Sequence, residues 1–139
     1  MTDNSLNLSQ VIRKRLTDAN KRYWAGDNIA DYITDKEKDM LVDELTEKFE
    51  GVLDSLIIDR HTDPNSMGTA RRLAKMYVYE IMAGRYEESP NATAFPNDTE
   101  GKYEGMLVVR SELKSMCSHH HQPVLCVAYI GIIAGPKLI

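Results

Sequence analysis

Residues 106–133 read MLVVRSELKSMCSHHHQPVLCVAYIGII, and this stretch decides the fold that we expect. The segments 103–113 and 124–133 are rich in Val, Ile, Leu and Tyr, a composition that favours β-strands. Every segment with helical spacing of its apolar residues precedes them. Helices followed by strands predict an α+β fold.

The connection between the two predicted strands holds Cys117 and three consecutive histidines, His119, His120 and His121. Thiolate and imidazole are ligands that zinc prefers, and a catalytic zinc ion takes three protein ligands and a water. Cys117 and His120 are close enough in sequence to share one ion across a tight turn, and His119 would then be free to move protons. The alternatives are a chance surface run or a tag fragment for the cluster, and an ordinary exposed or hydrogen-bonded side chain for His121.

Helical spacing is clearest in the segment that follows Thr34, and either Thr34 or Asp35 can cap this helix. The apolar residues at three- and four-residue steps in this segment should form core: Met40, Leu41, Leu45, Phe49, Val52, Leu53 and Leu56. A further helix is predicted from Gly68 to Ala83, closed by Gly84.

The segment from Leu8 to Trp24 combines sparse apolar residues at helical spacing with several basic ones. It predicts a solvated arm or an interface helix, and a phosphate-binding patch is the weaker alternative. Arg71, Arg72 and Lys75 lie on the polar face of the helix that begins near Gly68, and we expect them to face solvent. Residues 86–102 are predicted to be irregular, and so long a loop is often functional or interfacial.

Composition excludes several classes of protein. The chain has 139 residues with 42% hydrophobic and 27% charged residues, which is typical of a soluble globular domain. A net charge of -4 argues against binding a nucleic-acid polymer. No apolar run approaches the roughly 20 residues that cross a bilayer, so no membrane association is predicted. The 2 cysteines do not form a disulfide framework, which favours a reducing, cytoplasmic location.

Residues 36–139 resemble the GTP cyclohydrolase I family. The resemblance is carried by the segments Ser115–His120 with Pro123, Ala128–Gly131, Lys137–Ile139, Asp63–Asn65 and Thr69–Tyr77. It implies a division into an N-terminal helical arm, residues 1–34, and a tunnelling-fold domain, residues 35–139. The family fold is an antiparallel sheet with helices on one side, and its subunits join edge to edge into rings that stack as a decamer.

The resemblance also implies an activity and a site. The family converts GTP and water into 7,8-dihydroneopterin triphosphate and formate, for pterin and folate or 7-deazaguanine synthesis. Cys117 and His120 resemble two of the three zinc ligands. His119 resembles the histidine that protonates the guanine ring nitrogen while activated water opens the ring at C8. The implied partners are GTP as substrate and further copies of the chain.

Two positions depart from the family pattern: Ser118 stands where glutamate is common, and Cys126 where glycine is usual. Cys126 is predicted to be a buried strand cysteine, with a substitute thiolate ligand as the alternative. The family's third zinc ligand, a cysteine, lies downstream of the position matching Ile139, as do its guanine-binding glutamate and several phosphate-binding residues. We therefore expect a tunnelling fold that is incomplete at its C-terminus. The alternative function is a catalytically inactive module that binds a purine or pterin or assembles with other subunits.

Overall fold

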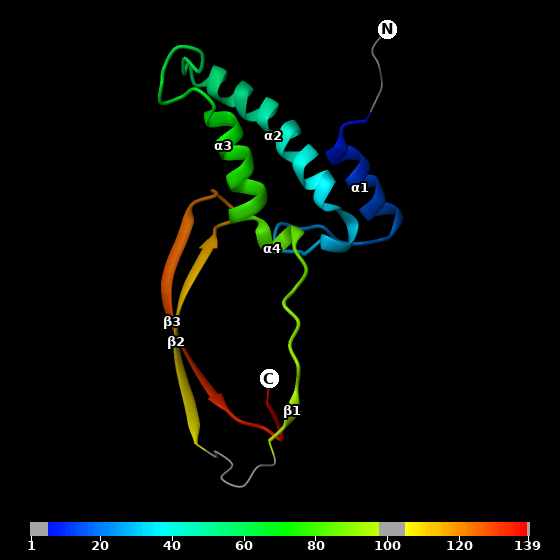
Figure 1. Ribbon diagram of the computed structural model, residues 1–139, viewed down its shortest axis with the longest axis vertical. Coiled ribbons are helices and arrows are strands. Elements are labelled where there is room, and N and C mark those ends of the chain that lie inside the picture. The colour runs from blue at the N-terminus through cyan, green and yellow to red at the C-terminus, as the bar shows by residue number, and fades with distance from the viewer. Residues whose placement is uncertain (1–5, 98–104, 139) are drawn as a thin grey trace. The chain divides into compact units, whose positions relative to one another are not determined.

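Helices occupy the first part of the chain and strands the second, as the predicted α+β class requires (Figure 1). This computed structural model describes residues 6–97 and 105–138. The chain divides into two units: a helical unit that ends at Glu88 and a strand unit that begins at Ser89. The expected domain boundary between residues 34 and 35 stays a prediction.

The first helix, α1 (Leu8–Asp18), is shorter than the predicted segment that ended at Trp24. It stops because Asn20 adopts a left-handed conformation with φ of 50°, which turns the chain away from the helix axis. The backbone N–H of Lys21 then donates to the carbonyl of Leu16 at 2.9 Å, which satisfies one of the helix's terminal carbonyl groups.

Helix α1 packs against the rest of the helical unit rather than standing free as a solvated arm. Its side chains Ile12 and Leu16 are 5% and 1% exposed and join a core cluster with Val42, Ala74 and Val78. Helix α1 is therefore part of the core of the helical unit, and its role as an interface helix stays a prediction.

Helix α2 (Asp35–Ser55) begins as predicted, with Thr34 as its N-cap. The backbone N–H of Thr34 donates to Glu37 at 2.9 Å, and that of Glu37 donates to the Thr34 hydroxyl at 3.3 Å. This reciprocal capping box satisfies two backbone donors that the helix leaves without partners.

The predicted core stripe of α2 is only partly right. Leu41 and Leu53 are buried, but Met40, Val52 and Leu56 are 47%, 50% and 63% exposed. The buried apolar residue of α2 that the prediction missed is Val42, and Lys38 is buried as well. Successive residues lie about 100° apart around a helix. Because the core contacts the face of α2 that holds Leu41 and Val42, Met40 faces away from it.

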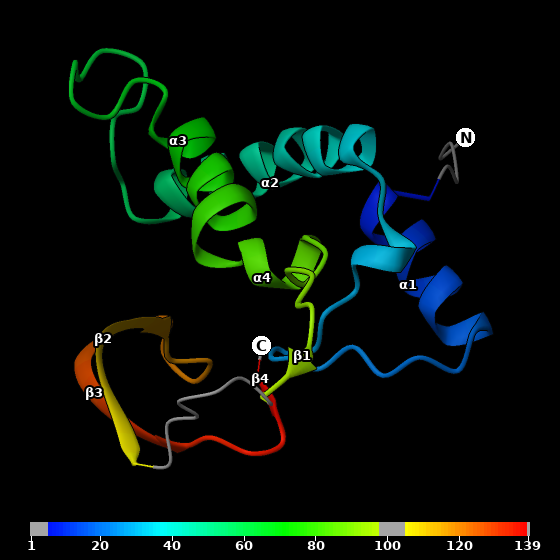
Figure 2. The same cartoon turned by 60° about the horizontal axis from the view of Figure 1, so that its bottom comes forward.

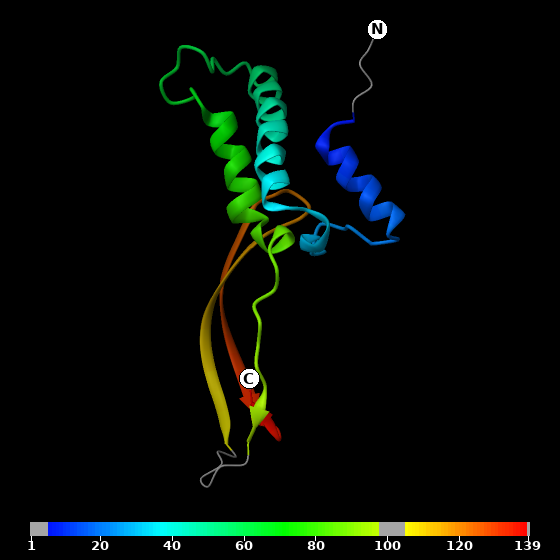
Figure 3. The ribbon, with the colours of Figure 1, turned by 45° about the vertical axis from the view of Figure 1, so that its right-hand side comes forward.

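The predicted single helix closed by Gly84 is wrong. It consists of α3 (Thr69–Met76), a π-helical segment η2 (Tyr77–Ile81) and α4 (Ala83–Tyr86), so Gly84 lies inside a helix. The Gly84 carbonyl accepts a hydrogen bond from the Asn28 side chain at 2.8 Å, which ties α4 to the loop after α1. Figure 3 shows α2 and α3 side by side. Arg71, Arg72 and Lys75 are exposed, as predicted.

The strand unit contains two antiparallel pairs. Strands β2 (Met106–Met116) and β3 (Pro123–Ile133) form a long hairpin, in register from the pair Met106–Ile133 to the pair Met116–Pro123 (Figure 2). Strands β1 (Phe95–Pro96) and β4 (Lys137–Leu138) form a short second pair. Both long strands were predicted. Residues 98–104, which include the expected start of the first strand at Tyr103, lie outside the described residues, as does Ile139.

Ile57, just after α2, provides a test of backbone strain. It adopts φ of 60°, where a β-branched residue is strained, and its side chain is 94% exposed. Replacing Ile57 with glycine should raise the free energy of unfolding by about 0.5–1 kcal/mol, since strain is relieved and no packing is lost. Urea denaturation measures the change. The control is Leu56→Gly at a helical φ of -81°, which should destabilise. Equal destabilisation by both changes would contradict this account.

The ion pair between Arg15 and Glu37 predicts a pH dependence. The guanidinium lies 2.7 Å from the carboxylate. This hydrogen bond, with that from the Thr34 N–H, lowers the pKa of Glu37 from 4.5 to about 2. A depressed carboxyl pKa stabilises the folded state above pH 4.5, and the contribution is lost as pH falls toward 2.

The variant Glu37→Gln should therefore be less stable than the parent chain by about 1 kcal/mol near neutral pH. The difference should shrink in the acid range. Urea titrations at several pH values measure it, and a difference that is independent of pH would contradict the role of the carboxylate.

Candidate metal centre

The turn between β2 and β3 is closed by backbone hydrogen bonds around Cys117. Its N–H donates to the carbonyl of Gln122 at 2.9 Å, and its carbonyl accepts from the N–H of His121 at 2.8 Å. Pro123 begins β3, a position where a proline needs no backbone donor. The turn therefore fixes the backbone of Cys117 at the end of a regular ladder, with three histidines beside it.

The Cys117 thiol and the His119 imidazole lie next to each other. The Cys117 Sγ atom is 3.9 Å from the Nδ1 atom of His119. The ring centroids of His119 and His120 are 6.4 Å apart. Cys117 is half-buried, whereas the three histidines are exposed. The turn thus gathers a thiol and two neighbouring imidazoles at one accessible point.

These donors fit zinc. Zn–S and Zn–N bonds of about 2.3 and 2.0 Å place two ligands of a tetrahedral ion about 3.5 Å apart. The separation between Cys117 and His119 is within about half an ångström of that value. It fits either a thiol–imidazole hydrogen bond or two ligands of one ion. The predicted assignment, with His120 as ligand and His119 as proton carrier, stays a prediction.

Among residues 6–97 and 105–138, no cluster of three or more His, Cys, Asp and Glu side chains could hold a metal ion.

Cys126 pairs in register with Leu113 and is exposed, so the prediction of a buried strand cysteine is wrong. Its exposure follows from the two-stranded hairpin, which leaves both faces of its residues open within the strand unit.

Sequence reasoning missed a second group of polar residues, which line a cavity in the helical unit. They come from α1, α2 and α4 and form no motif along the chain. The only local signal was the cluster of basic residues in the segment from Leu8 to Trp24.

Comparison with known proteins bears on this turn. Residues 45–139 match the GTP cyclohydrolase I family, and the matched span includes the whole β2–β3 hairpin. The chain belongs to the GTP cyclohydrolase I family. The small antiparallel sheets after N-terminal helices are consistent with an incomplete tunnelling fold.

Three relatives illustrate the extent of the similarity. GTP cyclohydrolase 1 of Flavobacterium johnsoniae is 35% identical over 109 residues, which cover 77% of this chain and 46% of the relative. The Aeromonas salmonicida protein of the same name is 35% identical over 99 residues, 67% of this chain and 44% of the relative. That of Yersinia pseudotuberculosis is 42% identical over 74 residues, 50% of this chain and 33% of the relative. The chain thus spans less than half the length of these curated relatives.

None of the described helices has the length and apolar character of a membrane span.

Substitutions of His121 test whether the backbone geometry of the turn supports metal binding. Its φ of 52° is left-handed, a conformation that glycine adopts freely and valine resists. The variant His121→Gly should retain the affinity for Co²⁺ within about threefold, and His121→Val should weaken it by about tenfold or more, a loss of 1–2 kcal/mol. Titration of the thiolate-to-cobalt absorption band measures both. Equal affinities of the two variants would contradict a role for the turn backbone.

Proposed function

We propose that this chain contributes the metal-binding turn of a zinc-dependent GTP cyclohydrolase I, which hydrolyses GTP to 7,8-dihydroneopterin triphosphate and formate. The observation that carries the proposal is the hydrogen-bonded turn that gathers Cys117, His119 and His120, in a chain that belongs to this family. Its product would enter pterin and folate or 7-deazaguanine synthesis.

In this proposal Cys117 and His120 are the zinc ligands that the turn provides. Bound zinc would supply a Lewis acid and a water with a pKa lowered toward about 7. A structural zinc site uses four protein ligands, whereas a catalytic one leaves a position open, so two ligands from one turn leave room for a further ligand and a water.

His119 is the residue proposed to move protons. An imidazole can carry a proton on either ring nitrogen, which suits it to donate one to the ring nitrogen of guanine as the imidazole ring of the base opens. Its position beside Cys117 would keep its ring within reach of the reacting base. Its exposed side chain leaves it open to a substrate.

The proposed partners are GTP and further copies of this chain in a ring, as in the decamers of the family, with a cytoplasmic location. Support for assembly comes from the hairpin, which exposes apolar side chains on both faces. They include Leu107, Val109, Leu125, Ile130 and Ile133. A ribbon of two strands is at best marginally stable alone, so further strands are needed to cover it.

The second candidate function is a non-catalytic module that binds a purine or pterin or assembles with other subunits. The observation that favours it is that residues 6–97 and 105–138 contain no group of three or more His, Cys, Asp and Glu side chains placed to hold a metal ion. The two functions differ in whether formate is released from GTP.

Zinc content and formate release from GTP test the proposal, in the 139-residue chain and in the product of the full reading frame that encodes it. Cys117→Ala and His120→Ala should lose zinc in either protein. In the full product His119→Ala should keep zinc and lose about 10²–10⁴-fold in turnover, the usual contribution of a general acid. For the 139-residue chain we expect weak or no turnover, since its described residues form no group of three metal ligands. The control is His121→Gly, which should keep zinc and activity.

Three results would contradict the proposal. Zinc content that is indifferent to Cys117→Ala would remove the metal site from this turn. Turnover that is indifferent to His119→Ala would remove the proton-transfer role. Zinc and GTP binding in the full product without formate release would favour the non-catalytic module.

A further inference from the structure

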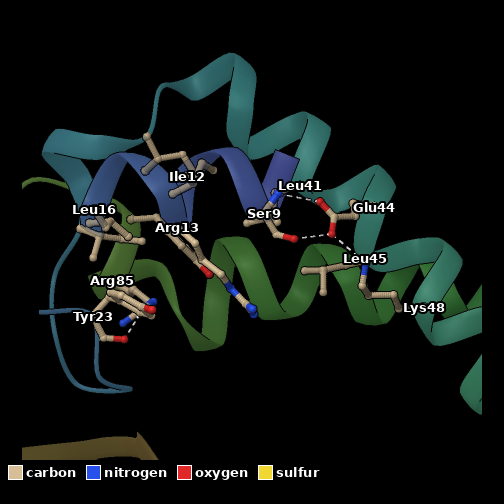
Figure 4. Close-up of a pocket in the computed structure, with 13 residues that line it drawn as sticks. Ser9, Ile12, Arg13, Leu16, Tyr23, Leu41, Glu44, Leu45, Lys48 and Arg85 are labelled. Atoms are coloured by element: carbon tan, nitrogen blue, oxygen red, sulfur yellow. Dashed lines mark hydrogen bonds and ion pairs between the residues drawn. The ribbon is translucent and has the colours of Figure 1, made fainter. Parts of the chain in front are cut away.

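The helical unit contains a cavity of about 510 Å³ between α1, α2 and α4 (Figure 4). Its apolar lining consists of six aliphatic side chains: Ile12, Leu16, Ile29, Ile33, Leu41 and Leu45. This volume and lining fall within the range of small-molecule sites.

One polar end of the cavity is already satisfied within the protein. The backbone N–H and the hydroxyl of Ser9 donate to the Glu44 carboxylate at 2.9 and 2.6 Å, and the Lys48 ammonium lies 2.7 Å from it. These contacts and hydrogen bonds lower the pKa of Glu44 despite its desolvation, so the carboxylate stays charged. Ser9, Glu44 and Lys48 therefore hold α1 on α2, and their polar groups are already paired with one another.

Arg13 differs from these residues. Arg13 is exposed, and among the described residues its guanidinium makes no hydrogen bond or ion pair; its side chain lines the cavity, and Figure 4 shows it extending away from α1. A second guanidinium in the lining, that of Arg85, donates to the carbonyls of Trp24 and Asp27 at 2.6 and 2.9 Å. The lining carries three cationic side chains, Arg13, Lys48 and Arg85, against one carboxylate, Glu44.

We propose that this cavity binds a monocarboxylic acid with an apolar body, which lies on the aliphatic lining while its carboxylate pairs with Arg13. An apolar lining favours the burial of a hydrocarbon chain or ring at about 25 cal/mol per Å². One unpaired guanidinium matches one carboxylate in a bidentate hydrogen bond. The site lies wholly within the helical unit and is independent of the proposed zinc chemistry.

Binding has a structural consequence, because the cavity walls come from separate helices. Ser9, Ile12 and Arg13 belong to α1, whereas Leu45 and Lys48 belong to α2. The cavity exists only while α1 is packed on α2. A ligand that binds this state alone stabilises it in proportion to the logarithm of its concentration, so it should hold α1 in place.

Decanoate is the probe, and decanol, which has the same apolar body without the charge, is its matched control. Methyl NMR signals of Ile12, Leu16 and Leu45 report on the cavity, and those of Ile132 and Ile133 report non-specific binding to the exposed hairpin. Decanoate should shift the cavity signals saturably, should bind about tenfold more tightly than decanol, and should slow amide hydrogen exchange in α1.

The variant Arg13→Met keeps an apolar stem and removes the charge, and it should weaken decanoate about tenfold while leaving decanol unchanged. Its control is Lys14→Met, one residue along α1, where the ammonium pairs with Asp18 at 2.6 Å and is not part of the cavity lining. Equal weakening by the two variants, equal affinities for decanoate and decanol, or shifts confined to the hairpin signals would overturn the proposal. The comparison of decanoate with decanol needs no variant, so it tests the role of the carboxylate even if Arg13→Met folds poorly.

Discussion

The hydrogen-bonded turn at Cys117 is the constraint on which the functional account depends. Two backbone hydrogen bonds, to Gln122 and from His121, fix the residue at the end of the β2–β3 ladder. This tight turn, with one left-handed residue, places the Cys117 thiol 3.9 Å from the imidazole of His119, the proposed proton carrier, and next to that imidazole lies the ring of His120, the proposed second ligand. The remaining parts of the proposed chemistry, a third ligand and a substrate pocket, rest on this local geometry.

The two units are stabilised in different ways. The helical unit has a core of its own, with side chains such as Leu16, Val42 and Val78 almost fully buried. In the strand unit the hairpin leaves its apolar residues exposed on both faces, so its regular pairing is not matched by burial. Hydrophobic burial is the dominant favourable term in folding. The hairpin therefore presents the surface that further strands would cover in the proposed assembly.

The sequence predicted the order of elements, both long strands, the start of α2 and the family, because periodicity, capping residues and the Cys-His motif are local signals. It did not predict that α1 ends at Asp18 or that Gly84 lies inside α4. The first depends on the left-handed backbone of Asn20, and the second is accompanied by a hydrogen bond from the Asn28 side chain to the Gly84 carbonyl. It also placed Met40 in the core, because periodicity gives a stripe but not the side from which partners approach. For the site, the Cys-His motif predicted candidate ligands, but neither the contact between Cys117 and His119 nor the cavity in the helical unit leaves a signal along the chain.

The most direct test of the account is X-ray absorption spectroscopy at the zinc edge, on the parent chain and on Cys117→Ala. Zinc bound at this turn should show a sulfur scatterer at about 2.3 Å and nitrogen scatterers at about 2.0 Å in the parent chain, with loss of the sulfur in the variant. A zinc environment of oxygen and nitrogen alone in the parent chain, unchanged by the substitution, would contradict the central claim that this turn binds the metal through its thiolate.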